Sequence, residues 1–304
     1  TGRSGVSELA NQHSSLLVAD PEVSENPEKF FDRIIEINLS ELEPMIVGPH
    51  TPDLARSVSD LGQEAKEKDW PTEIQAALIG SCTNSSYEDM ERAASIAKQA
   101  KEAGIKSKVQ FMVTPGSDTI DQTIRRDGQM QLLDDIGGTV LANACGPCIG
   151  QWKREDISKG DVNSIVSSYN RNFSGRNDGN HQTLSFLTSP EIVTAMALAG
   201  SLDFNPQKDK LTAADGTEFS LKPPTGSELP ANGFESSLVG FIPPTEGDVD
   251  LDVSSTSRRL QLLEPFKAIT KDELTDLPLL VKVKGKCTTA VSYTHLTLPT
   301  NREV

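Results

Sequence analysis

Short apolar segments alternate with longer amphipathic segments through most of the chain. Runs of four to seven residues that are mostly apolar and end at turn-forming residues are typical of buried strands. Five segments fit this description and predict strands: residues 33–39, 76–79, 108–113, 139–142 and 164–167.

Helical segments separate several of these strands. Ser85 and Glu88 have the spacing of a capping box, and the Ala-, Lys- and Glu-rich stretch after them predicts a helix to about Ala103, with Gly104 as its C-terminal stop. A second helix is predicted over roughly residues 117–133. Strands that alternate with helices indicate an α/β fold with a mainly parallel sheet and flanking helices.

Three polar loops follow separate predicted strands. One carries Cys82, another carries Cys145 and Cys148, and a third, rich in Gly and Asn, carries Arg171 and Arg176. Ligands of parallel sheets bind at the loops that leave the carboxyl ends of the strands. We therefore expect the three loops to converge on one site.

The chemistry of these loops narrows the class of ligand. Thiolates are soft ligands that favour iron–sulfur clusters, zinc or copper(I). Four thiolates close such a site, whereas the three at Cys82, Cys145 and Cys148 leave one coordination position open for substrate. The two arginines, five residues apart, suit bidentate capture of carboxylates or phosphate.

Composition excludes several other classes of protein. The 29 Lys and Arg against 44 Asp and Glu give a net charge of −15, which argues against general affinity for nucleic acid or an anionic membrane. Four cysteines in 304 residues are too few for a disulfide scaffold. No apolar run approaches the ~20 residues that span a bilayer.

The chain opens on Thr1, without an initiator Met or a signal or transit peptide, and we interpret that start as a truncation.

Long motifs around these residues resemble the aconitase family, nearest its mitochondrial type, over roughly residues 1–289. The Cys82 motif reads GSCTNSSYED, the second cysteine motif reads ANACGPCIGQW, and the arginine loop reads SYNRNFSGRND. LQLLEPF at 260–266 and VKVKGKCTT at 281–289 also fit. Several long motifs in the right order are specific to the aconitase superfamily, and less specific between aconitase proper and related hydro-lyases.

The resemblance implies a mechanism. Cys82, Cys145 and Cys148 would hold a [4Fe–4S] cluster whose fourth iron acts as a Lewis acid on the hydroxyl of citrate or isocitrate. Arg171 and Arg176 match the substrate-carboxylate arginines, and Asn170 matches an asparagine beside the cluster. The implied reaction is reversible isomerisation of citrate and isocitrate through cis-aconitate, by a monomer in the mitochondrial matrix that works in the citric acid cycle.

Other groups of the family's active site do not match any segment of this chain. They are the Asp/His pairs and a Glu that manage the leaving hydroxyl, and a serine base with an arginine beside it. We therefore expect no proton-transfer catalytic residue here and no isomerisation by this chain alone. The four histidines match no family motif and are expected to be surface residues: His13, His50, His181 and His295.

Composition and resemblance together predict five parts. Residues 1–44 would end a preceding domain, 45–230 would form the cluster-binding domain of the aconitase third-domain type, and 231–261 an extended interdomain linker rich in Pro, Asp and Ser. Residues 262–289 would begin a truncated swivelling domain. Residues 290–304 fit no family segment and are interpreted as a non-native tail. Cys287 is expected to be a free thiol.

Other functions remain open at this point. A zinc-binding structural module would use Cys-x-x-Cys but would normally need a fourth ligand at short spacing. A thioredoxin-like site could use the Cys-Gly-Pro-Cys of Cys145 to Cys148, although Cys82 would then be idle. A homoaconitase-type hydro-lyase would share all the motifs. RNA binding, known for a cytosolic aconitase relative without its cluster, is weakened by the net charge of −15.

Overall fold

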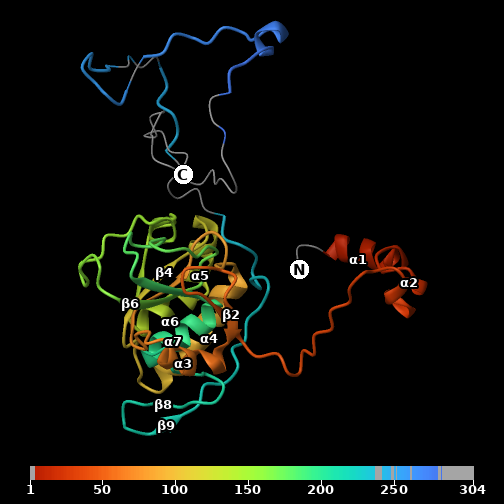
Figure 1. Cartoon of the computed structure of the whole chain (residues 1–304), viewed down its shortest axis with the longest axis vertical. Helices are drawn as coiled ribbons and strands as arrows, with labels where there is room; N and C mark the ends of the chain where they lie inside the picture. The colour runs from red at the N-terminus through yellow and green to blue at the C-terminus, as the bar shows by residue number, and fades with distance from the viewer. Residues whose placement is uncertain are drawn as a thin grey trace. The chain divides into compact units, whose positions relative to one another are not determined.

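The computed structural model describes residues 4–236, 242–247, 250, 252–260, 262–279 and 282. The chain divides into two compact units, residues 1–240 and residues 241–304 (Figure 1). All the described strands lie in the first unit, and the second contributes one 3₁₀ turn, Lys271–Leu274, among its described residues. The Cys287 and 290–304 predictions concern residues outside the described part of the chain.

A seven-stranded sheet forms the centre of the first unit, in the order β2-β1-β7-β6-β3-β4-β5. Strands β7, β6, β3, β4 and β5 run parallel, and β1 pairs antiparallel with both β7 and β2. The predicted α/β fold with a mainly parallel sheet is therefore confirmed. The strand bounds are β1 Met45–Val47, β2 Ala55–Ser57, β3 Ile74–Gly80, β4 Gln110–Thr114, β5 Gly138–Val140, β6 Asn163–Ser167 and β7 Thr183–Leu187, and a separate hairpin pairs β8 Leu211–Thr212 with β9 Glu218–Phe219.

Helices flank the sheet. The chain begins with two short helices, α1 Ser4–Gln12 and α2 Pro21–Glu25. The helices of the α/β unit are α3 Val58–Glu67, α4 Tyr87–Glu102, α5 Asp118–Arg126, α6 Gln129–Asp135 and α7 Pro190–Ala199. Within the part of the chain that the structure describes, no helix is long and apolar enough to cross a bilayer.

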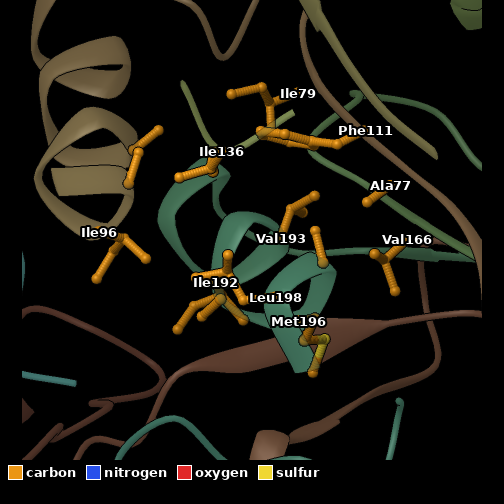
Figure 2. Packing of buried hydrophobic residues seen from close by; sticks show 14 of the residues in the cluster. Ala77, Ile79, Ile96, Phe111, Ile136, Val166, Ile192, Val193, Met196 and Leu198 are labelled. Atoms are coloured by element: carbon orange, nitrogen blue, oxygen red, sulfur yellow. The ribbon is translucent and has the colours of Figure 1, made fainter. Parts of the chain in front are cut away.

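Alternate residues of the central strands bury their side chains on opposite faces of the sheet, as the pleat requires. On one face Ala77 and Ile79 of β3 belong to a large apolar cluster with α3, α4, α6 and α7. Figure 2 shows labelled side chains of α7, among them Val193, in the same cluster as Ala77 and Ile79 of β3. On the other face a smaller cluster gathers strand side chains with two residues from the loops, Cys148 and Tyr169. The cysteine region therefore lies against the face opposite the main helical layer.

Two helix predictions need correction in detail. The predicted 117–133 helix is two helices, because Gly128 has φ +91° between Arg126, the last residue of α5, and Gln129, the first of α6. The capping box lies one residue later than predicted: Ser86 Oγ accepts from the Asp89 amide at 3.2 Å, and Asp89 Oδ2 accepts from the Ser86 amide at 3.0 Å. Gly104 follows the end of α4 with φ +68°, as expected of a helix stop.

The strand predicted over residues 33–39 is wrong. These residues form no strand and pair with no described strand. Ile35 is 71% exposed and Leu39 is 78% exposed. A strand needs a neighbouring strand for its backbone hydrogen bonds, so an alternating sequence without a partner stays irregular.

The polar face of α4 binds a later segment of the chain. Glu91, Ser95 and Gln99, spaced four residues apart, accept hydrogen bonds from backbone amides within residues 222–227 at 2.6, 3.2 and 2.8 Å respectively. Gln99 also donates to a backbone carbonyl of this segment at 3.1 Å. The segment that follows β9 is therefore held along α4 by side chains rather than by secondary structure of its own.

Candidate functional site

The Cys82 loop leaves β3 through a sharp turn. Gly80 has φ +98° and Ser81 has φ +73°, and a side chain at Gly80 would overlap the carbonyl oxygen of Thr114 at the end of β4. The Ser81 amide donates to that same Thr114 oxygen at 2.9 Å. Only glycine fits at position 80, and the turn brings Cys82 to the surface at the carboxyl end of β3.

The next strand in the sheet, β6, ends beside this turn and begins the arginine loop, residues 168–180. Asn170 donates its amide hydrogen to Thr83 Oγ1 at 2.9 Å. Cys82 Sγ lies 3.6 Å from the same Thr83 oxygen. Asn170 is thus tied to the Cys82 loop through one hydroxyl group.

The third loop, residues 141–156, follows β5 and is here called the cysteine loop. Cys145 precedes a 3₁₀ turn, Gly146–Ile149, and accepts a hydrogen bond from the Cys148 amide at 2.7 Å. The Cys148 thiol is buried and lies 4.0 Å from Asn170 Oδ1. Asn170 therefore contacts both cysteine-bearing loops, and the three predicted loops meet at one edge of the sheet.

The thiols themselves are not gathered into a finished metal site. Cys82, Cys145 and Cys148 are free, with Cys82 and Cys145 exposed. Among the described residues, no group of three or more His, Cys, Asp or Glu side chains stands close enough to hold a metal. The donor chemistry nevertheless fits an iron–sulfur cluster, since the loops that meet here carry three free thiols, the soft ligands that such clusters take.

The two arginines differ in their surroundings. Arg171 is exposed, whereas Arg176 is half-buried with its guanidinium carbon 5.1 Å from the centre of the Phe173 ring. Arg176 Nε is buried and has no hydrogen-bond partner among the described residues. A buried guanidinium N–H without an acceptor is costly, so this position favours an anionic ligand.

Tyr169 lies beneath the cysteine loop and is buried. Its burial, and next the negative charge of the neighbouring Cys148 thiolate, raise the pKa of Tyr169 above the ordinary value of 10.0. Its hydroxyl therefore stays protonated at neutral pH, and its ring packs in the same apolar cluster as Cys148. Tyr169 stands in the arginine-loop motif, but its packing against Cys148 has no signal in the sequence.

Three histidine predictions can be compared with the structure, because His295 lies outside the described residues. His13 and His181 are exposed, as predicted. His50 is half-buried, and its Nδ1 is buried without a hydrogen-bond partner. The surface prediction for His50 therefore holds only in part, because part of its ring lies inside the unit.

A cavity of about 680 Å³ lies elsewhere on the first unit. It is lined by residues around Pro44, by Arg92 and Glu191, and by Pro223 and Pro224, and it includes none of the cysteine or arginine residues above. This cavity therefore does not coincide with the candidate site, which lies at the carboxyl ends of the central strands.

Comparison with known proteins identifies the family of this chain. Residues 1–200 match the model of the aconitase family (aconitate hydratase). The chain belongs to the aconitase family.

Curated relatives extend the similarity over most of the chain. A probable mitochondrial aconitate hydratase of Dictyostelium discoideum is 53% identical over 291 residues, which are 95% of this chain and 37% of that protein. A probable mitochondrial aconitate hydratase of Caenorhabditis elegans is 54% identical over 289 residues, 95% of this chain and 36% of that protein. The Saccharomyces cerevisiae mitochondrial aconitate hydratase is 53% identical, with 95% and 37% covered. The chain thus spans little more than a third of the length of these relatives.

Proposed function

We propose that this chain is the cluster-binding part of a mitochondrial aconitate hydratase. The observation that carries the proposal is the position of Asn170, which touches the Cys82 loop through Thr83 and the cysteine loop at Cys148. The two cysteine-bearing loops next to Asn170 supply Cys82, Cys145 and Cys148 as the ligands of a [4Fe–4S] cluster. When bound, the cluster supplies a Lewis-acidic iron that favours departure of a substrate hydroxyl.

The residues of the arginine loop provide substrate binding in this proposal. Arg171 and Arg176 bind carboxylates of citrate, cis-aconitate and isocitrate by charge-assisted hydrogen bonds. The unpartnered Nε of Arg176 supports this role, because a carboxylate supplies the missing acceptor. Asn170 donates and accepts beside the thiols and orients the groups around them.

The proposed reaction is the reversible isomerisation of citrate to isocitrate through cis-aconitate, in the mitochondrial matrix and by a monomer. Nucleic acid and membranes are not proposed partners. We propose that the groups for proton transfer come from parts of the protein outside this chain, so that the chain alone does not turn over. The chain covers 36–37% of the length of these two relatives, and this partial coverage supports the proposal that the other catalytic groups lie elsewhere in the protein.

We also propose how this chain divides into domains. Residues 45–230 are the cluster-binding domain, 1–44 end the preceding domain, and 231–261 link to a swivelling domain that begins at 262–289. The division between the two compact units, after residue 240, falls inside the proposed linker and supports it. Residues 290–304 are proposed to be a non-native tail.

An anaerobic binding experiment tests this function. The purified chain, reconstituted with iron and sulfide, is titrated with citrate and, separately, with homocitrate, and cluster absorbance and isocitrate formation are both followed. The proposal expects saturable binding of citrate, stronger than binding of homocitrate, and no isocitrate. Stronger binding of homocitrate would favour a homoaconitase-type enzyme, and turnover near that of a complete aconitase would contradict the proposed inactivity. Uptake of zinc alone would favour a structural zinc module.

A further inference from the structure

A buried ion pair joins the two loops that carry the cysteines and the arginines. Arg154 lies six residues after Cys148, and Asp178 lies two residues after Arg176. Arg154 Nη1 is 3.5 Å from Asp178 Oδ2, and each side chain is only 2% exposed. Among the ion pairs of the described residues, this is the one in which both side chains are almost fully buried.

The surrounding groups satisfy both members of the pair. Arg154 Nη1 also donates to Asn163 Oδ1 at 2.7 Å, and its Nε donates to Asp156 Oδ1 at 3.0 Å. Asp178 accepts from Thr183 Oγ1 at 2.7 Å and from the Asn180 amide at 2.9 Å. A buried polar network whose members are all partnered holds a single geometry.

The aromatic ring of Trp152 completes the arginine's environment. The guanidinium carbon lies 4.9 Å from the centre of this ring, which belongs to the cysteine loop. Arginine is suited to such a position because its planar group can stack on a ring and still donate several hydrogen bonds at fixed angles. Lysine keeps the charge but not this geometry.

A second contact lies close to the thiols. Asn177 is buried and donates its amide hydrogen to the carbonyl oxygen of Pro147, which stands between Cys145 and Cys148, at 3.1 Å. A side chain at Gly150 would lie 3.1 Å from the carbonyl oxygen of Arg176, so the backbones of the two loops also approach closely. Arg176 is therefore flanked on its C-terminal side by two residues that bind the cysteine loop.

We propose that Arg154 and Asp178 are positioning residues that hold the arginine loop against the cysteine loop. Their pairing fixes where Arg176 stands relative to Cys145 and Cys148, and so aligns the carboxylate-binding groups with the metal-binding groups. This inference rests on the proposed function for its purpose, but the physical connection between the loops can be tested without cluster or substrate.

The test substitutes a residue of the arginine loop and measures the reactivity of a thiol in the cysteine loop. Asp178→Asn keeps the side-chain shape and removes the charge. Asp121→Asn is the matched control, because Asp121 pairs with Arg125 at 2.9 Å in α5, where the arginine side chain is 48% exposed. Both variants and the unchanged chain are alkylated with iodoacetamide in the cluster-free state, and the rate is determined separately for Cys82 and Cys148 by peptide mass spectrometry.

We expect Asp178→Asn to raise the alkylation rate of Cys148 by about fivefold or more, because the cysteine loop opens locally. The alkylation rate of Cys82 should change by less than about twofold. Asp121→Asn should leave both rates unchanged. Equal acceleration at both thiols would mean general loosening and would overturn the proposal, as would an unchanged Cys148 rate. Arg154→Lys should give a Cys148 alkylation rate between those of the unchanged chain and Asp178→Asn. This variant replaces Asp178→Asn in the test if Asp178→Asn does not fold.

Iron uptake after anaerobic reconstitution separates this inference from the proposed function. If the unchanged chain takes up no iron while Cys148 still responds selectively to Asp178→Asn, the loop connection stands and the proposed function fails. If iron is bound and Cys148 does not respond, the proposed function stands and the positioning role fails.

Discussion

The backbone amide of Gly80 donates a hydrogen bond to the hydroxyl of Ser168 over 2.9 Å. Gly80 is the last residue of β3 and Ser168 follows the last residue of β6, so this bond joins the ends of two adjacent parallel strands. Cys82 lies two residues after Gly80, and Asn170 lies two residues after Ser168. The bond therefore sets the distance between two of the three loops of the candidate site.

Replacement of the Ser168 hydroxyl is expected to destabilise the chain. Ser168→Ala leaves the buried Gly80 amide without this acceptor and should lower the free energy of unfolding by about 1–3 kcal/mol. Ser167→Ala is a demanding control, because Ser167 is equally buried but its Oγ has no hydrogen-bond partner. Urea unfolding of the two variants should separate them clearly. Equal losses of stability would show that the Gly80–Ser168 bond has no particular role.

The turn after β3 should not tolerate a side chain. Gly80→Ala combines positive φ with overlap of the Thr114 carbonyl, and we expect a loss of more than about 2 kcal/mol in the free energy of unfolding. Gly137→Ala separates the two effects, since Gly137 has φ +96° with no atom within 4 Å of the added carbon. The control should lose about 1 kcal/mol. If both variants unfold at the same denaturant concentration, the close approach to Thr114 is not important.

Arg176 should be needed for binding citrate but not for binding iron. Arg176→Lys keeps the positive charge and loses the paired N–H donors, so citrate affinity of the reconstituted chain should fall about tenfold or more. Iron content should stay unchanged, because Arg176 supplies no metal ligand. Arg259→Lys, at an exposed position, should bind citrate like the unchanged chain. Isothermal titration calorimetry measures the citrate affinities. Equal affinities for all three proteins would contradict this prediction.

Much of the parallel sheet could be predicted from the sequence, because strands buried on both faces give short apolar runs that end at glycine. β3 to Gly80 and the Cys82 turn are examples. The 33–39 strand failed for the opposite reason: alternation describes a half-buried strand only if a partner strand exists, and partners are not visible in a local pattern. The break at Gly128 was missed because helical residues lie on both sides of it.

The candidate site could be predicted as a set of loops but not as a network. The loops of Cys82, Cys148 and Arg176 were predicted to converge because each follows a strand, and the structure places these loops at one edge of the sheet. The Arg154–Asp178 pair had no local signal, since its partners are 24 residues apart and meet only after β5 and β6 take their places in the sheet. The burial of His50 was likewise invisible, because it depends on how a short turn folds back.

His50 should make stability depend on pH near neutrality. Burial, and next the charge of His181, lower the pKa of His50 below its ordinary value of 6.5. Both folded and unfolded chains have neutral His50 above that pH, but below it the unfolded chain binds the proton first. Its contribution to stability is therefore present above pH 6.5 and is lost as the pH falls through the folded pKa.

Urea unfolding between pH 7 and pH 5 would measure this effect. His50→Asn suits the left-handed backbone at this position, where φ is +62°, and should give a weaker pH dependence than the unchanged chain. His13→Asn, at an exposed site, should keep the original dependence. Parallel pH profiles for His50→Asn and the unchanged chain would show that the histidine is not the responsible group.

Iron and acid-labile sulfide per chain, measured after anaerobic reconstitution, show whether Cys82, Cys145 and Cys148 hold a cluster. We expect about four of each in the unchanged chain, the content of one [4Fe–4S] cluster. Cys148→Ser should lose them, while Cys287→Ser should keep them because only Cys82, Cys145 and Cys148 are proposed as ligands. Zinc in place of iron, or equal loss in both variants, would contradict a cluster held by these three thiols.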